Sequence, residues 1–288
     1  MAARPRTLPA AIAPVLVGTA AAVEWAGELP RFGAFVAALI GSVFIQIGTN
    51  LANDYSDARR GADTADRLGP VRVTSSGLVA PRRVLYATWI AFAVAVACGI
   101  YLAAVAGIVI ILIGAVSIAA GVLYTGGPRP YGYAGLGEVF VFLFFGLVAV
   151  NGSYYVQLEE LDALPLGLSI AVGFLATAIL VVNNVRDLET DRRAAKMTLA
   201  VRMGRRNAVA LYRMLVLGAF LVLPLALIAG SGSAWALLGL IALPMAIKPM
   251  RILSSRSDGA ALNGALAATG ALLGVFSLLV SAGLLIGS

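Results

Sequence analysis

Long apolar runs alternate with short polar segments along the whole chain. Each run has roughly 17 to 25 residues, the length that an α-helix needs to cross the hydrocarbon core of a bilayer. We therefore predict an all-α fold, a polytopic membrane bundle of about nine transmembrane helices. The predicted helices lie at about residues 8–24, 32–52, 84–104, 106–124, 136–156, 165–185, 207–229, 233–250 and 261–286.

Composition narrows the picture further. The chain is 60% hydrophobic and 12% charged, and its mean hydropathy is +0.94, whereas about one quarter of the residues in a soluble domain are charged. It contains no histidine and a single cysteine, Cys98. These counts exclude imidazole metal ligands, a histidine general base and an internal disulfide. Any catalysis must therefore use carboxylates, amides, hydroxyls and cations.

The basic residues are distributed asymmetrically between the predicted loops. If the N-terminus is cytoplasmic, all 21 Lys and Arg residues except Arg31 lie on the cytoplasmic side. This is the positive-inside pattern, so we expect a multi-pass protein of a bacterial cell (inner) membrane, with its N-terminus and acidic segments in the cytoplasm. Because this pattern also accounts for the net charge of +7, we expect a lipid bilayer and no nucleic acid as the surroundings of the chain.

Two polar cytoplasmic segments repeat each other. In "NLANDYSD" after the second predicted helix and "NNVRDLETD" after the sixth, Asn50 and Asp54 match Asn183 and Asp187 at a spacing of four. Both helices run in the same direction, which predicts a parallel repeat with a pseudo-twofold axis along the membrane normal. We expect one domain, 1–288, built from two pseudo-symmetric four-helix halves around a central cavity. The predicted boundaries are about 8–124 and 136–250 for the repeats and 261–286 for the last helix.

Residues three and four positions apart share one face of a helix, so the acids of each segment are expected to point in a common direction. Two such clusters facing one another would need cations, because uncompensated carboxylates near a membrane are unfavourable. Oxygen ligands without His or Cys select a hard ion such as Mg²⁺, which commonly also binds substrate phosphates. The interleaved basic residues Arg72, Arg186 and Lys196 suit a polyphosphate. The alternative for a single cluster is a solvated loop; a matched pair favours a Mg²⁺–diphosphate site.

The two segments resemble the aspartate-rich motifs of the UbiA superfamily of intramembrane prenyltransferases. Further stretches resemble its menaquinone-pathway branch: "RPRTLPAAIAPVLVGTA" (4–20), "QIGTNLAND" (46–54), "YTGGPRPYGYAGLGEVFVFLFFG" (124–146) and "KMTLAVRMG" (196–204). The resemblance implies Mg²⁺-dependent transfer of a polyprenyl group from polyprenyl diphosphate to 1,4-dihydroxy-2-naphthoate, with two Mg²⁺ ions on the diphosphate. In the first motif, Gly61 stands where the family usually has its last Asp, and Asp63 takes over that position.

The site residues that follow from the motifs and the resemblance fall into three groups. The catalytic candidates are Asp54, Asp57, Asp187 and Asp191. The metal-ligand candidates are Asp54, Asp57, Asp63, Asp187 and Asp191. The substrate-binding candidates are Asn50, Asn53, Arg72, Asn183, Asn184, Arg186, Lys196, Tyr124, Tyr131 and Glu138.

Two of these assignments have competing interpretations. Tyr124, Tyr131 and the nearby Tyr133 would face an allylic cation or belong to an interfacial aromatic belt. Glu138 would bind or deprotonate the aromatic acceptor, or it would pair with Arg129 or cap a helix.

Two other functions remain open on the sequence. Internal repeats with acidic residues near helix ends also occur in ion-coupled transporters, although those proteins place their coupling groups near the middle of the bilayer. A different UbiA-type aromatic prenyltransferase, acting on another acceptor, is the second alternative.

Overall fold

The computed structural model describes residues 4, 7–61, 68–69 and 72–288, and no strand occurs within them. The helical elements are α1 (Pro9–Ala26), α2 (Phe32–Arg59), α3 (Pro81–Ala106), α4 (Val109–Leu123), η2 (Tyr131–Ala134), α5 (Gly137–Val141), η3 (Phe142–Val148), α6 (Ala149–Leu158), α7 (Ala163–Arg186), α8 (Leu188–Arg193), α9 (Leu199–Ala229), η4 (Ala234–Ala246), α10 (Ile247–Ser255) and α11 (Gly259–Gly287).

The predicted all-α membrane bundle is confirmed. Among the described residues, eight helical segments are long and apolar enough to cross a membrane by length and composition. The one predicted helix not among these eight is the fourth, 106–124, which corresponds to α4; it has 15 residues and is therefore only about 22 Å long at 1.5 Å per residue. It is shorter than a typical hydrocarbon core.

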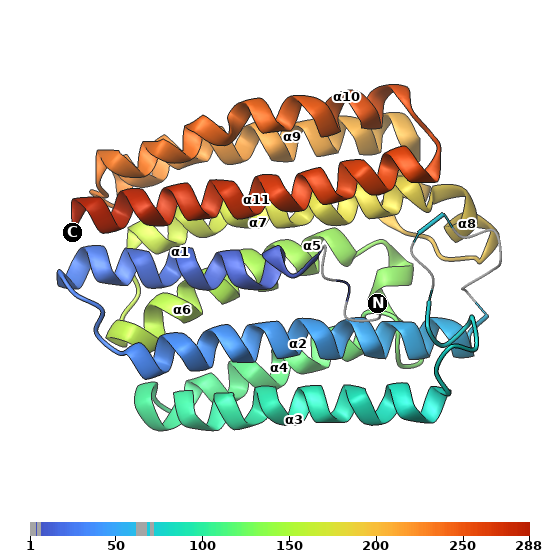
Figure 1. Ribbon diagram of the computed structural model, residues 1–288, viewed down its shortest axis with the longest axis horizontal. Coiled ribbons are helices and arrows are strands. Elements are labelled where there is room, and N and C mark those ends of the chain that lie inside the picture. Colours follow the sequence, from blue (N-terminus) through green and yellow to red (C-terminus); the bar gives the residue numbers. More distant parts are fainter. Residues whose placement is uncertain (1–3, 5–6, 62–67, 70–71) are drawn as a thin grey trace.

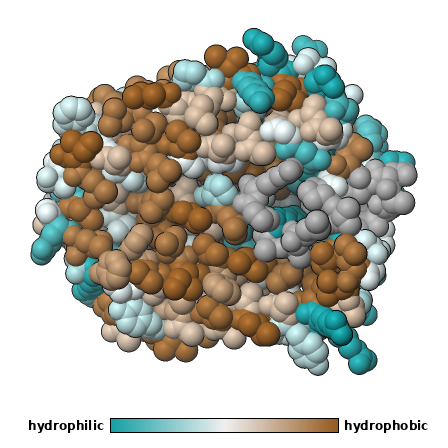
Figure 2. Space-filling view, viewed as in Figure 1, coloured by the Kyte–Doolittle hydropathy of each residue, from teal (hydrophilic) through white to brown (hydrophobic). Residues whose placement is uncertain are grey.

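The long helices lie side by side in two groups (Figure 1). Helices α2, α3 and α4 form one side, and α7, α9, α10 and α11 form the other, with α1 and the α5–α6 segment between them. The polar segments at 72–80, at 124–136 and around α8 gather at one end of the bundle (Figure 1). Apolar side chains cover much of the visible face, and hydrophilic side chains concentrate toward its ends (Figure 2). The two-repeat organisation stays a prediction.

Three helices differ from their predicted extents in ways that affect the site. Helix α2 continues to Arg59, so the first acidic motif is helical. Helix α9 begins at Leu199 and is kinked at Gly204, whose φ of 78° lies in the left-handed region. The fifth predicted span consists of three consecutive pieces, of which the middle one, η3, is a π-helix. Such π turns are common near functional sites.

The core is unevenly distributed between the two sides. The larger cluster of buried apolar residues joins α1, α6, α7, α9 and α11, whereas a small cluster of alanine, leucine, isoleucine and valine joins α2, α3, α4 and α6. Between α2–α4 and α5–α6 lies a cavity of about 310 Å³. The side of the bundle with the smaller buried cluster therefore contains the space in which a ligand can bind.

Candidate active site

The first motif occupies the last turns of α2, at the end of the bundle that holds the polar connections. Asn50, Asn53 and Asp57 are spaced three, four and seven residues apart, so they share one face of the helix, and all three line the cavity. Asp54 does not line it. Its carboxylate accepts the backbone N–H groups of Val73, at 3.3 Å, and Thr74, at 3.0 Å, so Asp54 holds the segment that follows the motif.

Asp57 is surrounded by donors. Arg72 Nη2 lies 3.2 Å from its Oδ2, and Lys196 Nζ lies 3.8 Å from the same oxygen. The hydroxyl of Tyr133 donates to Oδ1 at 3.0 Å. Beside it, Thr125 donates to the amide oxygen of Asn53 at 2.9 Å. The three contacts of Asp57 compensate the charge of its carboxylate, since the residue is only 1% exposed.

The second motif closes the cavity from the end of α7. Asn183 and Asp187 line the cavity, but Arg186, predicted to contact phosphate, does not. Its guanidinium instead forms a fork with Asp187, with Nε–Oδ1 at 2.8 Å and Nη2–Oδ2 at 2.6 Å, and Nη2 also donates to Asn183 Oδ1 at 2.8 Å. Nη1 donates to Asn263 on α11. Arg186 therefore orients the two cavity-lining side chains of its motif.

Lys196 connects the two motifs. Its Nζ lies 3.8 Å from Asp57 Oδ2 and 4.0 Å from Asp191 Oδ1, and 5.2 Å from the centre of the Tyr133 ring. Lys196 and Arg72 both line the cavity. The acidic motifs, more than 120 residues apart in the chain, thus meet at one cavity mouth together with two cations. Asp63, the remaining predicted ligand, lies outside the described residues.

The two predicted cavity tyrosines do line the cavity. Tyr131 stacks on Phe140, with ring centres 3.9 Å apart and planes 20° apart, and it meets Tyr124 edge-on. Burial raises the pKa of both phenols, and the nearby charges of Glu138 and Asp191 raise the pKa of Tyr124 further. Both hydroxyls therefore stay protonated at neutral pH, and that of Tyr131 donates to the Ala120 carbonyl oxygen at 2.8 Å.

Glu138 occupies a different place from the one expected for an acceptor-binding residue. It is 6% exposed and its Oε1 accepts a hydrogen bond from Asn184 Nδ2 at 2.8 Å. Neither residue is among those that line the cavity. The pair joins α5 to α7 behind the cavity wall. It also makes no ion pair with Arg129 among the described contacts.

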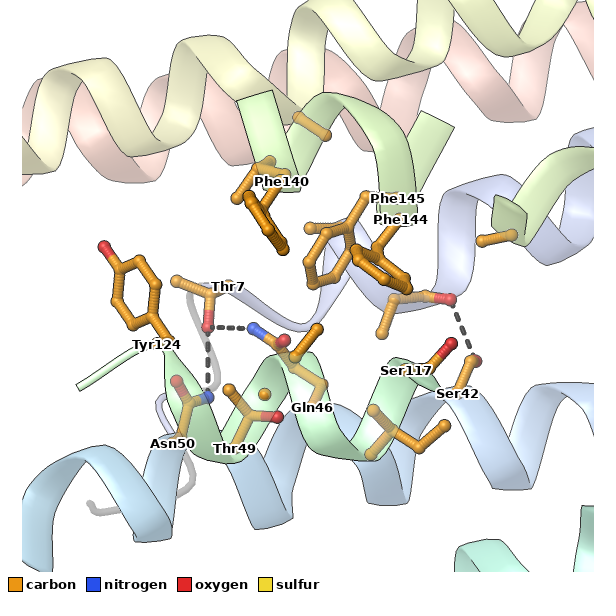
Figure 3. A pocket seen from close by; sticks show the side chains of 18 of the residues that line it. Thr7, Ser42, Gln46, Thr49, Asn50, Ser117, Tyr124, Phe140, Phe144 and Phe145 are labelled. Atoms are coloured by element: carbon orange, nitrogen blue, oxygen red, sulfur yellow. Dashed lines mark hydrogen bonds between the residues drawn. The ribbon is translucent and has the colours of Figure 1, made fainter. Parts of the chain in front are cut away.

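Several polar residues of the cavity lining were not predicted, among them Arg4, Thr7 and Gln46. Arg4 and Thr7 come from the segment before α1, and Gln46 lies one turn before Asn50 on the same face of α2. Figure 3 shows Thr7, Gln46 and Asn50 pointing toward one another, opposite Phe140 and the following aromatic residues. The sequence could have indicated Gln46, because it lies four residues before Asn50 and so shares its helix face.

The deeper part of the cavity is apolar. From the motif end it extends between α2, α3, α4 and α6, and its walls carry mainly alanine, glycine, isoleucine, leucine and valine, with the small side chains of Ser42, Ser117 and Ser153 among them. Phe140, Phe144 and Phe145 form one side of the upper part (Figure 3). A ligand with a charged head and a long hydrocarbon tail matches this division.

The oxygen donors at the mouth suit a divalent cation shared with a ligand. Within the described residues, no group of three or more Asp, Glu, His or Cys side chains could hold a metal ion by itself. Instead, each motif brings one carboxylate, Asp57 or Asp187, and neighbouring amide oxygens to the cavity. Mg²⁺ favours such a partial set of oxygen ligands and completes its coordination with water and substrate phosphates. The residues present therefore fit Mg²⁺ bound together with a diphosphate.

Comparison with known proteins agrees with this geometry. Residues 11–267 match the UbiA prenyltransferase family. The chain belongs to the UbiA prenyltransferase family. The 1,4-dihydroxy-2-naphthoate octaprenyltransferase of Mycobacterium tuberculosis is 43% identical over 99% of this chain and 96% of its own length. The enzyme of the same name from Escherichia coli is 39% identical, over 94% of this chain and 90% of its own.

Solved structures of this UbiA family share the fold. A UbiA homologue from Archaeoglobus fulgidus, bound to DMAPP and Mg²⁺, is 16% identical and superimposes with a TM-score of 0.62 over 97% of each chain. The apo structure of a UbiA homologue from Aeropyrum pernix is 14% identical, with a TM-score of 0.67 over 98% of this chain and 96% of that one. At these identities the likeness concerns the fold alone.

Proposed function

We propose that this protein transfers a polyprenyl group from an allylic polyprenyl diphosphate to 1,4-dihydroxy-2-naphthoate, in menaquinone biosynthesis. The bond between the first prenyl carbon and the diphosphate oxygen breaks, and a new bond forms at the ring carbon that carries the carboxylate. That carboxylate leaves as CO₂, and the products are demethylmenaquinol and diphosphate. The observation that carries the proposal is the meeting of both acidic motifs and two cations at the mouth of an apolar cavity.

The polar mouth would hold the diphosphate. Arg72 and Lys196 line the cavity and would donate to phosphate oxygens, while Asp57 and Asp187 at the cavity, with Asp191 beside Lys196 just outside its lining, would hold two Mg²⁺ ions. When bound, Mg²⁺ neutralises the negative charge that develops on the departing diphosphate. Arg186 would keep Asp187 in position through its fork.

The apolar cavity would hold the tail and exclude water from the allylic cation. Below the mouth, the described residues of α2, α3, α4 and α6 that line it include no charged side chain that could capture the cation. The aromatic faces of Tyr124, Tyr131 and Phe140 lie between the mouth and the apolar part, where cation–π attraction would favour the positive charge. The naphthoate acceptor would have to approach in the same region.

An acceptor panel tests the proposal. Purified protein in liposomes is supplied with Mg²⁺, a labelled polyprenyl diphosphate and one aromatic acceptor at a time. We expect prenylated product with 1,4-dihydroxy-2-naphthoate, none after EDTA, and recovery of activity when Mg²⁺ is restored. Preferential use of 4-hydroxybenzoate or homogentisate would reassign the protein to another UbiA-type reaction. Proton flux without product would indicate a transporter.

A further inference from the structure

A single hydroxyl fixes the orientation of two amides at the cavity. Thr7 Oγ1 lies 3.0 Å from the carbonyl oxygen of Arg4, 3.2 Å from Gln46 Nε2 and 3.5 Å from Asn50 Nδ2 (Figure 3). A hydroxyl has one proton. Because the Arg4 carbonyl can only accept, that proton is donated to it, and Thr7 Oγ1 must accept from both amides. The NH₂ groups of Gln46 and Asn50 therefore point toward Thr7, and their amide oxygens point away from it.

Gln46 consequently presents an acceptor to the cavity. The residue lines the cavity and is 8% exposed. In the part of the chain that the structure describes, its Oε1 accepts no hydrogen bond. Since Gln46 lines the cavity, this oxygen is an acceptor that a donor of a bound ligand can reach.

The surroundings indicate which ligand brings it. Phe140 and Phe144 lie across the cavity from Gln46 (Figure 3). Phe140 stacks on Tyr131 with ring centres 3.9 Å apart, and the Phe144 ring is nearly parallel to it with centres 6.1 Å apart. Aromatic faces favour a further planar ring at stacking distance.

Gln46 lies four residues before Asn50, about 6 Å farther from the motif end at 1.5 Å per residue. Asp57, at the diphosphate end, lies eleven residues after Gln46, about 16 Å along α2 at 1.5 Å per residue. Gln46 therefore lies on the deeper side of the mouth, where a ring that meets the first prenyl carbon would place its far hydroxyl.

We propose that Gln46, oriented by Thr7, accepts a hydrogen bond from a ring hydroxyl of the aromatic acceptor, whose ring lies against Phe140. This inference rests on the proposed function and deepens it, since it names residues that select the acceptor. Gln46 contacts the substrate, and Thr7 is a positioning residue. The substrate class is a hydroxylated aromatic ring whose O–H group is free to donate.

Acceptor ethers test this assignment in the full-length protein in liposomes. The acceptors are 1,4-dihydroxy-2-naphthoate and its two monomethyl ethers, each of which lacks one O–H donor. For the wild type, we expect kcat/KM to fall about tenfold with one of the ethers, as the loss of a single hydrogen bond predicts. In Gln46→Leu and Thr7→Val, the acceptor KM should rise by about the same factor, and the preference for the O–H group should disappear.

The controls separate this role from a structural one. Thr7→Ser keeps the hydroxyl and should retain the preference. Thr88→Val removes a buried hydroxyl of α3 that donates to the Val84 carbonyl and does not line the cavity. This variant should leave the KM of the acceptor and the KM of the polyprenyl diphosphate unchanged. If Gln46→Leu does not fold, the acceptor KM values of Thr7→Val and Thr7→Ser test the inference instead: only Thr7→Val should show the rise.

Three results of the KM measurements would contradict either the role of Gln46 or the proposed function. If the wild type prenylates naphthoate but the variants keep its KM and its ether preference, the inference is wrong and the proposed function stands. A rise in the KM of the polyprenyl diphosphate instead assigns Gln46 to the donor and also overturns the inference. If the wild type makes no naphthoate product, the proposed function itself fails.

Discussion

In each motif, one carboxylate faces the cavity and a buried arginine forms an ion pair with it. Asp57 and Asp187 are nearly buried, and each is held by a buried arginine, Arg72 or Arg186. Removing one partner from such a buried pair leaves an uncompensated charge, which is strongly unfavourable. The carboxylates are therefore best tested by substitutions that keep their shape.

Asp57→Asn and Asp187→Asn should each lower kcat by about two to three orders of magnitude, because electrostatic stabilisation of the departing diphosphate is lost. The measurement is prenylated product formed per unit time in liposomes. Glu189→Gln is a matched control, since Glu189 lies on α8 in the same motif but is exposed. Near-normal turnover of either aspartate variant would contradict the role of that motif at the diphosphate.

Packing between elements shapes the wall of the cavity. The π-helix η3 crosses α7 at a close contact, where a Cβ atom on Gly146 would lie 2.7 Å from Gly173 Cα and 2.7 Å from the Ser169 carbonyl oxygen. Both neighbours are backbone atoms, which cannot rotate out of the way. Only glycine at position 146 lets these helices approach this closely.

Gly146→Val should therefore destabilise the protein by about 1–3 kcal/mol through overpacking, which lowers the apparent unfolding temperature by roughly 3–10 °C. Thermal unfolding in detergent measures this. Gly264→Ala in α11 is the control, because a Cβ atom there meets nothing within 4 Å. Equal unfolding temperatures for the two variants would show that the η3–α7 contact is looser than described.

On the opposite end of the bundle, Arg31 joins three elements. Its Nη1 donates to the carbonyl oxygens of Val105 at the end of α3 and Val156 at the end of α6, each at 3.3 Å. Its Nη2 pairs with Glu159 at 2.5 Å. The side chain of Gln157 exchanges two hydrogen bonds with the Arg31 backbone. A cation at helix C-termini is also favoured by the helix dipole.

Arg31→Ala should lower the unfolding free energy by about 1–2 kcal/mol, a figure already reduced because the ion pair is partly exposed. The same thermal assay should show a decrease of roughly 3–6 °C. Arg256→Ala removes an exposed arginine that pairs with Asp258, two residues away, and should have a much smaller effect. A similar decrease in the unfolding temperature of both variants would mean that the hydrogen bonds of Arg31 to α3 and α6 do not stabilise the protein.

The whole molecule places its polar segments at opposite ends (Figure 1). We predict that the end with the acidic motifs is cytoplasmic, because nearly all basic residues gather on that side of the chain. Cysteines introduced in a Cys98→Ala background test this. Leu161→Cys, in the connection between α6 and α7, should react with an impermeant maleimide in intact cells, and Ser75→Cys should react only after permeabilisation. The reverse pattern would invert the orientation.

The sequence alone was sufficient for the features that depend on local physics. A helix satisfies its own backbone hydrogen bonds and needs only a long apolar run to cross a membrane, so most spans were predictable within a few residues. The exceptions are the polar ends of α2 and α9, which extend the helices seven and eight residues beyond the predicted apolar runs. The spacing of Asn50, Asn53 and Asp57 likewise sets a shared helix face without reference to the rest of the chain.

Only the tertiary structure decided which side chains face the cavity. Asp54 lies one turn after Asn50, yet it binds the backbone of the following segment, and Glu138 binds Asn184 behind the wall. Thr7 reaches Gln46 across 39 residues. The partner of a polar group depends on how distant helices pack and on which donors that packing brings within about 3 Å, and no local spacing contains that information.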